Sequence, residues 1–136
     1  MLSPKKLLEN ARNRIAKREN WAQGQLATTA VGSPVSATSP DACKWCSIGA
    51  IAAEAGTGLD KITCLGGEVL DSTYGYTGAP PEYNDALRAL RRSYKELFPT
   101  LPYDSIAWFN DEHGGTVGHE GVLKAFDHAI DSLRGE

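Results

Sequence analysis

Residues 39–56 read S-P-D-A-C-K-W-C-S-I-G-A-I-A-A-E-A-G, and this stretch decides which fold we expect. Ser39 before Pro40 is typical of a helix start, because serine caps the first turn and proline suits its first position. Asp41 adds an acid at the positive end of the helix dipole. The residues that follow are apolar nearly all round, which indicates a helix inside the core. The sequence therefore predicts a central, buried helix over residues 40–55.

Three further segments carry apolar residues at helical spacing. The first follows Ser3 and Pro4, the second begins at Pro80-Pro81 and stops before Pro99, and Thr116 is the expected cap of the third. Their apolar positions are Leu7, Leu8, Ala11 and Ile15; Tyr83, Ala86, Leu87, Leu90, Tyr94 and Leu97; and Val122, Leu123, Phe126, Ala129, Ile130 and Leu133. These patterns predict amphipathic helices packed around the central one.

The segments between the helices lack a firm period. Residues 25–38 fit an extended loop better than a short hairpin, residues 59–80 are irregular with one short element near 68–70, and residues 105–109 form a brief element. The chain is therefore expected to be mainly α: a compact single domain over residues 1–136, with about four helices, a central buried helix and long irregular loops.

Composition and charge exclude several classes of function. A net charge of -3 and a pI near 5.6 give no electrostatic reason to expect nucleic-acid or membrane binding. No apolar run approaches the roughly 20 residues of a spanning helix, and the charged N-terminal stretch lacks the apolar region of a secretory signal. Three cysteines without regular spacing do not form a secreted disulfide framework. We expect a cytoplasmic protein, in a bacterial cell or an infected host.

Cys43 and Cys46 have the C-x-x-C spacing of half a zinc site, for which His113 and His119 would be the other half and Cys64 a spare ligand. Zinc knuckles place this motif on a tight turn, whereas the signals here predict a helix. A redox pair is also disfavoured, since thioredoxin-type sites follow a strand and no strand–helix–strand pattern surrounds this one. The sequence therefore predicts no metal and no cofactor.

A third interpretation makes Cys46 a nucleophile. His119 would be its base, and Asn110 or Asp111 would orient the histidine in a Cys-His-Asn/Asp constellation. Papain-like amidases place the nucleophile at a helix start but carry the base on a sheet, which this chain hardly offers. The favoured alternative is that Cys46 lies in the core as a small hydrophobe beside Trp45, with a half-exposed, incidental Cys43.

The three tryptophans each lie beside small polar residues. If their segments converge, the tryptophans and their neighbours would wall a binding pocket. The ligand-binding candidates are Trp21, Gln23, Trp45 and Trp108; the other polar residues that would line such a pocket are Ser47, Asn110, Asp111 and His119. The alternative is that the tryptophans anchor the core and give their indole N–H groups to these polar neighbours.

Several landmarks occur in one order: L-L-E-N-A-R-N-R-I, W-A-Q-G-Q-L-A, S-P-D-A-C-K-W-C-S-I-G-A-I, I-A-W-F-N-D and T-V-G-H-E-G-V-L-K-A-F-D-H-A-I. This succession resembles a family of small actinobacterial and phage proteins, domain of unknown function 6197. The resemblance implies that Cys46 alone of the C-x-x-C pair is a family feature. Phe109 interrupts the family's W-N-D-like segment, and Val117-Gly118 separates Thr116 from His119, which the family places side by side. Both departures argue against a catalytic histidine, and the resemblance implies no activity.

We therefore expect a non-enzymatic binding protein, a phage or prophage accessory factor that contacts a host protein or a small ligand. The alternative is a small thiol hydrolase that uses Cys46, His119 and Asn110 or Asp111.

Overall fold

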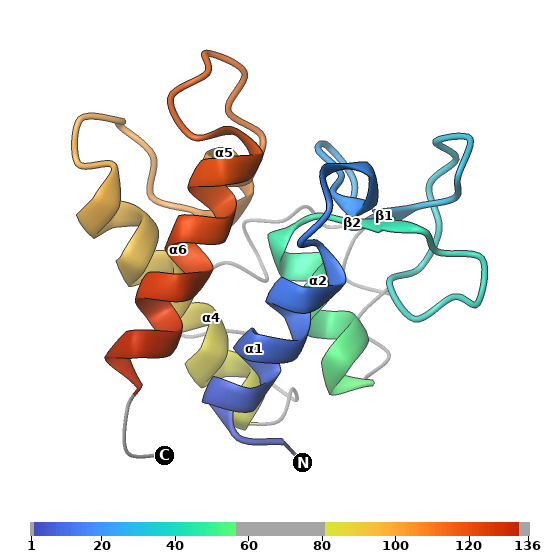
Figure 1. Cartoon of the computed structure of the whole chain (residues 1–136), viewed down its shortest axis with the longest axis horizontal. Helices are drawn as coiled ribbons and strands as arrows, with labels where there is room; N and C mark the ends of the chain where they lie inside the picture. The colour runs from blue at the N-terminus through green and yellow to red at the C-terminus, as the bar shows by residue number, and fades with distance from the viewer. Residues whose placement is uncertain (1, 57–80, 134–136) are drawn as a thin grey trace.

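The computed structural model describes residues 2–56 and 81–133 and confirms a mainly α protein with loops (Figure 1). Its helices and strands are α1 (Pro4–Arg14), the 3-10 helix η1 (Arg18–Asn20), β1 (Ala27–Thr28), β2 (Lys44–Trp45), α2 (Ser47–Ala55), α4 (Pro81–Leu97), α5 (Ile106–Asn110) and α6 (Gly118–Ser132). The element expected near residues 68–70 and the thiol of Cys64 lie outside the described residues. The extent of a single domain over residues 1–136 stays a prediction.

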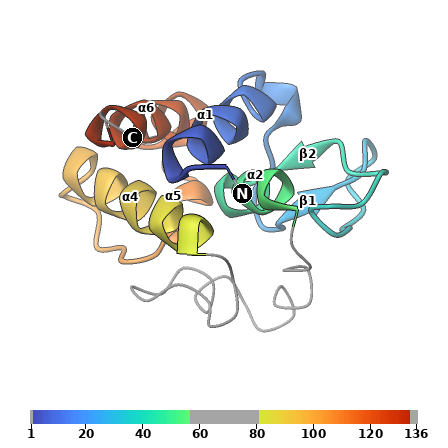
Figure 2. The ribbon, with the colours of Figure 1, turned by 90° about the horizontal axis from the view of Figure 1, so that it is seen from below.

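Helix α1 lies at the middle of the helical packing. It contacts α2, α4 and α6, and α4 and α6 pack against each other. Figures 1 and 2 show α4 and α6 on one side of α1, with α2 and the two short strands on its other side. Among the described residues, no helix has the length and apolarity needed to cross a membrane.

The starts of α1 and α4 are as predicted. The Ser3 side chain caps α1 by accepting a hydrogen bond from the backbone N–H of Lys6 at 3.1 Å, and Pro4 is the first helical residue. Helix α4 begins at Pro81 and ends at Leu97. The predicted apolar positions of α1 and α4 are buried except Leu97, which is 37% exposed at the helix end.

Helix α2 is largely buried, as predicted, but it begins at Ser47 and not at residue 40, and α1 rather than α2 takes the central place. Its first six residues are buried, from Ser47 to Ala52. The cap-and-proline signal at Ser39 forms a turn instead, in which the N–H of Ala42 donates to the Ser39 carbonyl at 3.1 Å.

Strand pairing explains this difference. Strand β2 lies antiparallel to β1, and the N–H of Cys46 donates to the carbonyl of Leu26 at 3.1 Å. These partners are distant in sequence, so tertiary hydrogen bonds override the local helix signals. A Cβ atom at Gly49 would lie 1.9 Å from that same Leu26 oxygen, so the first turn of α2 meets the backbone just before β1 at a glycine.

The segment over residues 25–38 is a loop for most of its length, as predicted, but it also contains the short hairpin pairing that the sequence did not favour. Thr28 bridges Pro34, and the N–H of Thr29 donates to the carbonyl of Ser33 at 2.9 Å. Gly32, in the left-handed region with φ of 91°, makes the reversal.

Thr116 does not cap α6, contrary to the prediction. Val117 occupies the N-cap position without a side-chain hydrogen bond. The carboxylate of Glu112 instead accepts hydrogen bonds from the backbone N–H groups of Thr116 and Val117, each at 3.0 Å. An acid from the preceding turn therefore satisfies backbone groups at the helix start.

Candidate functional site

Asn110, at the end of α5, joins three segments of the chain. Its side chain is buried, and Oδ1 accepts hydrogen bonds from Trp21 Nε1 at 2.9 Å, from Ser47 N at 3.0 Å and from Ser47 Oγ at 2.8 Å. Ser47 is the first residue of α2, so one of these bonds satisfies a backbone N–H that the helix itself leaves without a partner.

The amide nitrogen of Asn110 is also fully used. Nδ2 donates to the carbonyl of Ala22 at 3.0 Å and to Asp111 Oδ1 at 2.8 Å, and Gln23 Nε2 donates to the Asn110 carbonyl at 3.1 Å. We call this network the Asn110 hub; its members are Trp21, Ala22, Gln23, Ser47, Asn110 and Asp111. A buried amide with every donor and acceptor engaged holds the structure together. Orienting a histidine would cost it one of these bonds.

Cys46 is buried at the N-cap position of α2. Its Sγ accepts a hydrogen bond from the N–H of Gly49 at 3.3 Å. Burial raises the pKa of the thiol to about 12, against the lowering by that hydrogen bond. Since the thiolate is the nucleophilic form, this environment opposes nucleophilic chemistry. Cys43, by contrast, is exposed.

His119 lies in the first turn of α6 and contacts the end of α1. Its Nε2 is 2.7 Å from the carbonyl oxygen of Ile15; because a carbonyl only accepts, Nε2 carries the proton and donates. The imidazole ring also lies 5.5 Å from the Trp21 ring. Between Cys46 and His119, within the described part of the chain, there is no hydrogen bond. Asn110 and Asp111 meet each other but do not orient the histidine.

The residues considered for zinc do not assemble in the described structure. Among residues 2–56 and 81–133 there is no group of three or more His, Cys, Asp or Glu side chains that would hold a metal ion.

The tryptophans separate into two groups. Trp21 gives its indole N–H to the hub, and Trp45 gives its own to the Ala37 carbonyl at 3.1 Å. The guanidinium of Arg14 lies over the Trp45 ring, 4.6 Å from its centroid. Trp108 is different, because 62% of its surface is exposed. Trp21 and Trp45 thus engage their indole N–H groups within the protein, whereas Trp108 faces outward.

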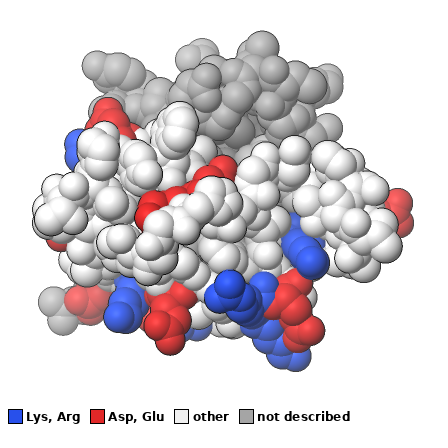
Figure 3. Space-filling view, turned by 90° about the horizontal axis from the view of Figure 1, so that it is seen from above, with Lys and Arg blue, Asp and Glu red and all other residues white. Residues whose placement is uncertain are grey.

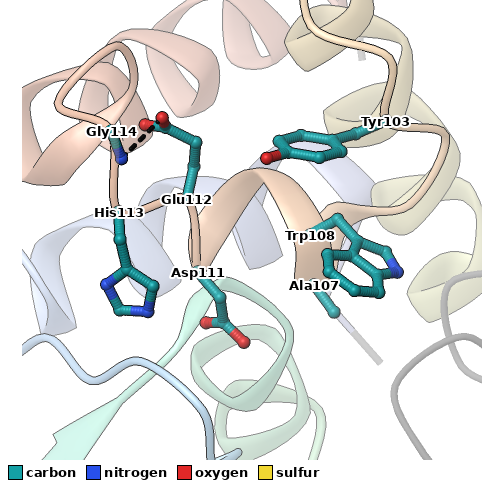
Figure 4. A pocket seen from close by; sticks show the side chains of 7 residues that line it. All are labelled: Tyr103, Ala107, Trp108, Asp111, Glu112, His113 and Gly114. Atoms are coloured by element: carbon teal, nitrogen blue, oxygen red, sulfur yellow. Dashed lines mark hydrogen bonds between the residues drawn. The ribbon is translucent and has the colours of Figure 1, made fainter.

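An open cavity of about 690 Å³ lies beside Trp108, between the chain that precedes α5 and the loop that follows it (Figure 4). We call it the Trp108 hollow; it is lined by Tyr103, Ala107, Trp108, Asp111, Glu112, His113 and Gly114. Figure 4 shows the two aromatic rings on one side of the hollow and the acidic and histidine side chains across from them.

The aromatic side of the hollow is anchored to the core. The rings of Tyr103 and Trp108 stack with centroids 5.9 Å apart and planes at 24°. Tyr103 also packs edge-on against the fully buried Phe109 at 5.6 Å. Because Tyr103 is held by the core, it holds Trp108 in turn, and an ordered wall costs a ligand less conformational entropy than a mobile one.

The acidic side of the hollow is ordered by backbone donors. Asp111 Oδ1 accepts from the N–H of Gly24 at 3.0 Å as well as from Asn110. Glu112 uses one oxygen for Gly114, at 2.7 Å, and the other for Thr116 and Val117. The hydrogen bond from Val117, with those from Gly114 and Thr116, lowers the pKa of Glu112, so this acid stays ionised.

Of the residues that line the hollow, the sequence pointed to Trp108 and Asp111, and to His113 only as a zinc ligand; it missed the others. One signal was present: Ile106, Phe109 and Asn110 are spaced for a single buried helix face, which leaves Trp108 on the opposite face. Tyr103 precedes the helix, and no periodic pattern places it against Trp108.

A second polar cluster was also missed. His128 on α6 lies between two residues of α4, with Nδ1 2.8 Å from Ser93 Oγ and Nε2 3.2 Å from Glu96 Oε2. The order serine, histidine, acid is that of hydrolytic relays, but Ser93 is only 1% exposed, so a substrate cannot reach its hydroxyl. The cluster ties α4 to α6.

A family model described as Family of unknown function (DUF6197) matches residues 1–132. No curated protein and no solved structure matches the chain. The match confirms the resemblance expected from the order of the sequence landmarks, and its description carries no activity.

Proposed function

Because this chain belongs to the family of unknown function DUF6197, whose description gives no activity, we propose from the site itself that it is a small, non-enzymatic binding protein whose ligand enters the Trp108 hollow. More specifically, the proposed role is that of a phage or prophage accessory factor that contacts a host protein or a small ligand. The support for that role is a short, acidic chain without catalytic motifs. The hollow favours the small ligand.

The observation that carries the proposal is the exposure of Trp108. Tryptophan is a large apolar residue, and Trp108 is 62% exposed although its ring stacks on an anchored tyrosine. Aromatic residues held in this way are enriched among those that dominate binding energy. The cavity of about 690 Å³ beside it falls within the ~300–1,000 Å³ of small-molecule sites.

The alternative, a thiol hydrolase, finds less support in the geometry. The pKa of Cys46 is raised by burial, and the ring of His119 donates to a backbone carbonyl. A thiol hydrolase needs the opposite arrangement, a lowered thiol pKa and a histidine within reach of the sulfur.

The proposal is tested by following the indole N–H signal of Trp108 in an NMR spectrum while a fragment library is titrated in; Trp108→Phe assigns the signal. At least one fragment should shift this signal. Trp108→Ala, in which binding is followed at the fragment's own signals, should bind that fragment more than tenfold more weakly, since a central aromatic contact is lost.

Val31→Ala is the matched control, because Val31 is an apolar residue that is 89% exposed and lies outside the hollow. It should bind the fragment as the unchanged protein does. Fragments that bind without moving the Trp108 signal, or that bind Trp108→Ala equally well, would contradict the proposal.

A further inference from the structure

We infer that the Trp108 hollow takes an organic cation that carries N–H donors, a primary ammonium or a guanidinium group. This inference rests on the proposed binding function and names the chemical class of its ligand. The charge of the lining, the free oxygen of Asp111 and the aromatic wall support it separately.

The lining of the hollow has acidic groups and no fixed positive charge among the described residues. Asp111 and Glu112 contribute two carboxylates, and no lysine or arginine belongs to the lining. Figure 3 shows the face seen from above, where acidic atoms lie near the middle among uncharged ones, while acidic and basic atoms lie together along the lower edge. A concave site of one sign attracts ligands of the other sign.

Asp111 offers a carboxylate that is already oriented. Its Oδ1 is held by the N–H of Gly24 and by Asn110 Nδ2, at 3.0 and 2.8 Å. Its Oδ2 accepts no hydrogen bond from residues 2–56 or 81–133. The fold therefore fixes one oxygen and leaves the other free to accept from a donor. Because the carboxylate is already oriented, ligand binding loses little conformational entropy in ordering it.

Glu112 has a different part in the same site. Both of its oxygens already accept backbone N–H groups, from Gly114, Thr116 and Val117. It therefore adds negative charge beside the hollow without competing for the donors of a ligand. The lowered pKa of Glu112 is consistent with this constant charge.

The aromatic wall suits a cation as well. A cation within about 6 Å of a tryptophan centroid is attracted by the negative face of the ring. The protein itself already uses this contact, because the Arg14 guanidinium lies 4.6 Å from the centroid of Trp45. Trp108 offers an exposed indole of the same kind, and no cation of the lining occupies it.

The free oxygen distinguishes between classes of cation. A primary ammonium or a guanidinium donates N–H groups to a carboxylate, whereas a quaternary ammonium has none to donate. The hollow should therefore prefer agmatine and n-butylammonium to tetramethylammonium, and it should reject propionate.

These four compounds are the probes of the test, which is a titration of the full chain followed at the Trp108 indole signal. Agmatine and n-butylammonium should shift the signal in a saturable way, and added salt should weaken their binding. Asp111→Asn keeps an oxygen for Gly24 but loses the charge and the free acceptor; it should weaken agmatine binding about tenfold or more. Asp41→Asn, at an exposed acid outside the hollow, should bind agmatine normally.

The results separate this inference from the proposed function. If propionate binds as well as agmatine, or Asp111→Asn binds agmatine unchanged, the cation inference is wrong. A neutral fragment that needs Trp108 would then leave the proposed function standing. If no fragment and no cation moves the Trp108 signal, both are wrong. The probe series on the unchanged protein decides the cation question even if Asp111→Asn folds poorly.

Discussion

Asn110 shows how one buried polar side chain places several parts of the chain. Its single oxygen serves an indole, a backbone N–H and a hydroxyl, while its nitrogen reaches the carbonyl of Ala22 and the carboxylate of Asp111. The hub thus links the wall of the Trp108 hollow to the start of α2. Had Asn110 been apolar, its neighbours would be buried polar groups without partners.

Replacement of Asn110 should therefore be costly. Asn110→Ala leaves Trp21 Nε1 and the N–H of Ser47 without their acceptor, and each such loss costs ~1–3 kcal/mol. We expect the free energy of unfolding, measured with urea, to fall by about 3 kcal/mol or more. Asn13→Ala, at an exposed position on α1, should change it by less than ~0.5 kcal/mol. Equal effects of the two changes would show that the hub is not a stabilising network.

Cys46 should be an inert thiol. Burial raises its pKa from 9.0 to about 12, so at neutral pH the folded protein holds roughly a thousandfold less thiolate at this position than the unfolded chain. Iodoacetamide labelling, resolved by peptide mass spectrometry, should modify Cys46 about a thousandfold more slowly in native protein than in denaturant. Exposed Cys43 should react in both states. Fast native labelling of Cys46 would favour the thiol hydrolase.

The same pKa predicts a pH dependence of stability. The folded-state pKa of Cys46 lies above the ordinary value. The stability that the protein gains from keeping this thiol neutral is therefore fully present below about pH 9, and it is lost as the pH rises toward about 12. The free energy of unfolding should decline over this window, and Cys46→Ala should decline less steeply. Parallel curves for the two proteins would contradict the burial of this thiol.

At the scale of elements, α1 and α4 were predictable because their signals are local. Ser3 and Pro4 start the first helix, Pro81 starts the second, and the apolar residues keep one period. The start of α2 was not predictable in this way, because strand pairing with β1 takes residues that have helix signals. The cap of α6 was missed for a related reason: Glu112 acts from outside the helix, across a turn.

The close approach of α2 to the backbone of Leu26, the residue before β1, gives a test at this scale. Gly49→Ala would place a Cβ 1.9 Å from the Leu26 carbonyl oxygen, and backbone cannot move aside as a flexible side chain can. We expect a loss of ~1–3 kcal/mol or more in the free energy of unfolding.

Gly56→Ala is the comparison for that change. Gly56 has a φ of 67°, and no atom lies within 4 Å of an added Cβ. Alanine there should therefore lower the free energy of unfolding only through backbone strain, by ~1–2 kcal/mol. The loss for Gly49→Ala should be the larger. A smaller loss would mean that α2 and the backbone of Leu26 can separate without cost.

For the whole molecule, the sequence predicted the fold class better than the site. Fold class follows from several periodic segments that agree with one another. The hollow depends on Tyr103 and Trp108 meeting, and on Asp111 and Glu112 binding backbone groups of Gly24 and Val117. Such contacts join residues with no common period, so composition and spacing do not reveal them.

The single domain predicted from the sequence has a direct consequence for unfolding. Helix α1 packs against α2 on one side and against α4 and α6 on the other, and the hub ties residues 21–24 to α2 and α5. A chain joined in this way should unfold in one cooperative step.

Two probes test this, in protein carrying Trp108→Phe so that fluorescence reports only Trp21 and Trp45. Their fluorescence reports the unfolding of the part that contains the two strands, and far-ultraviolet circular dichroism reports the unfolding of all the helices. The urea midpoints and slopes of the two probes should coincide. If the elements on one side of α1 unfold, α1 is exposed, and the elements on its other side lose the helix against which they pack. Adding Asn110→Ala should move both midpoints to lower urea together. If the fluorescence midpoint alone moves, the two sides of α1 unfold independently, and the chain consists of two cooperative units with the hub inside one of them.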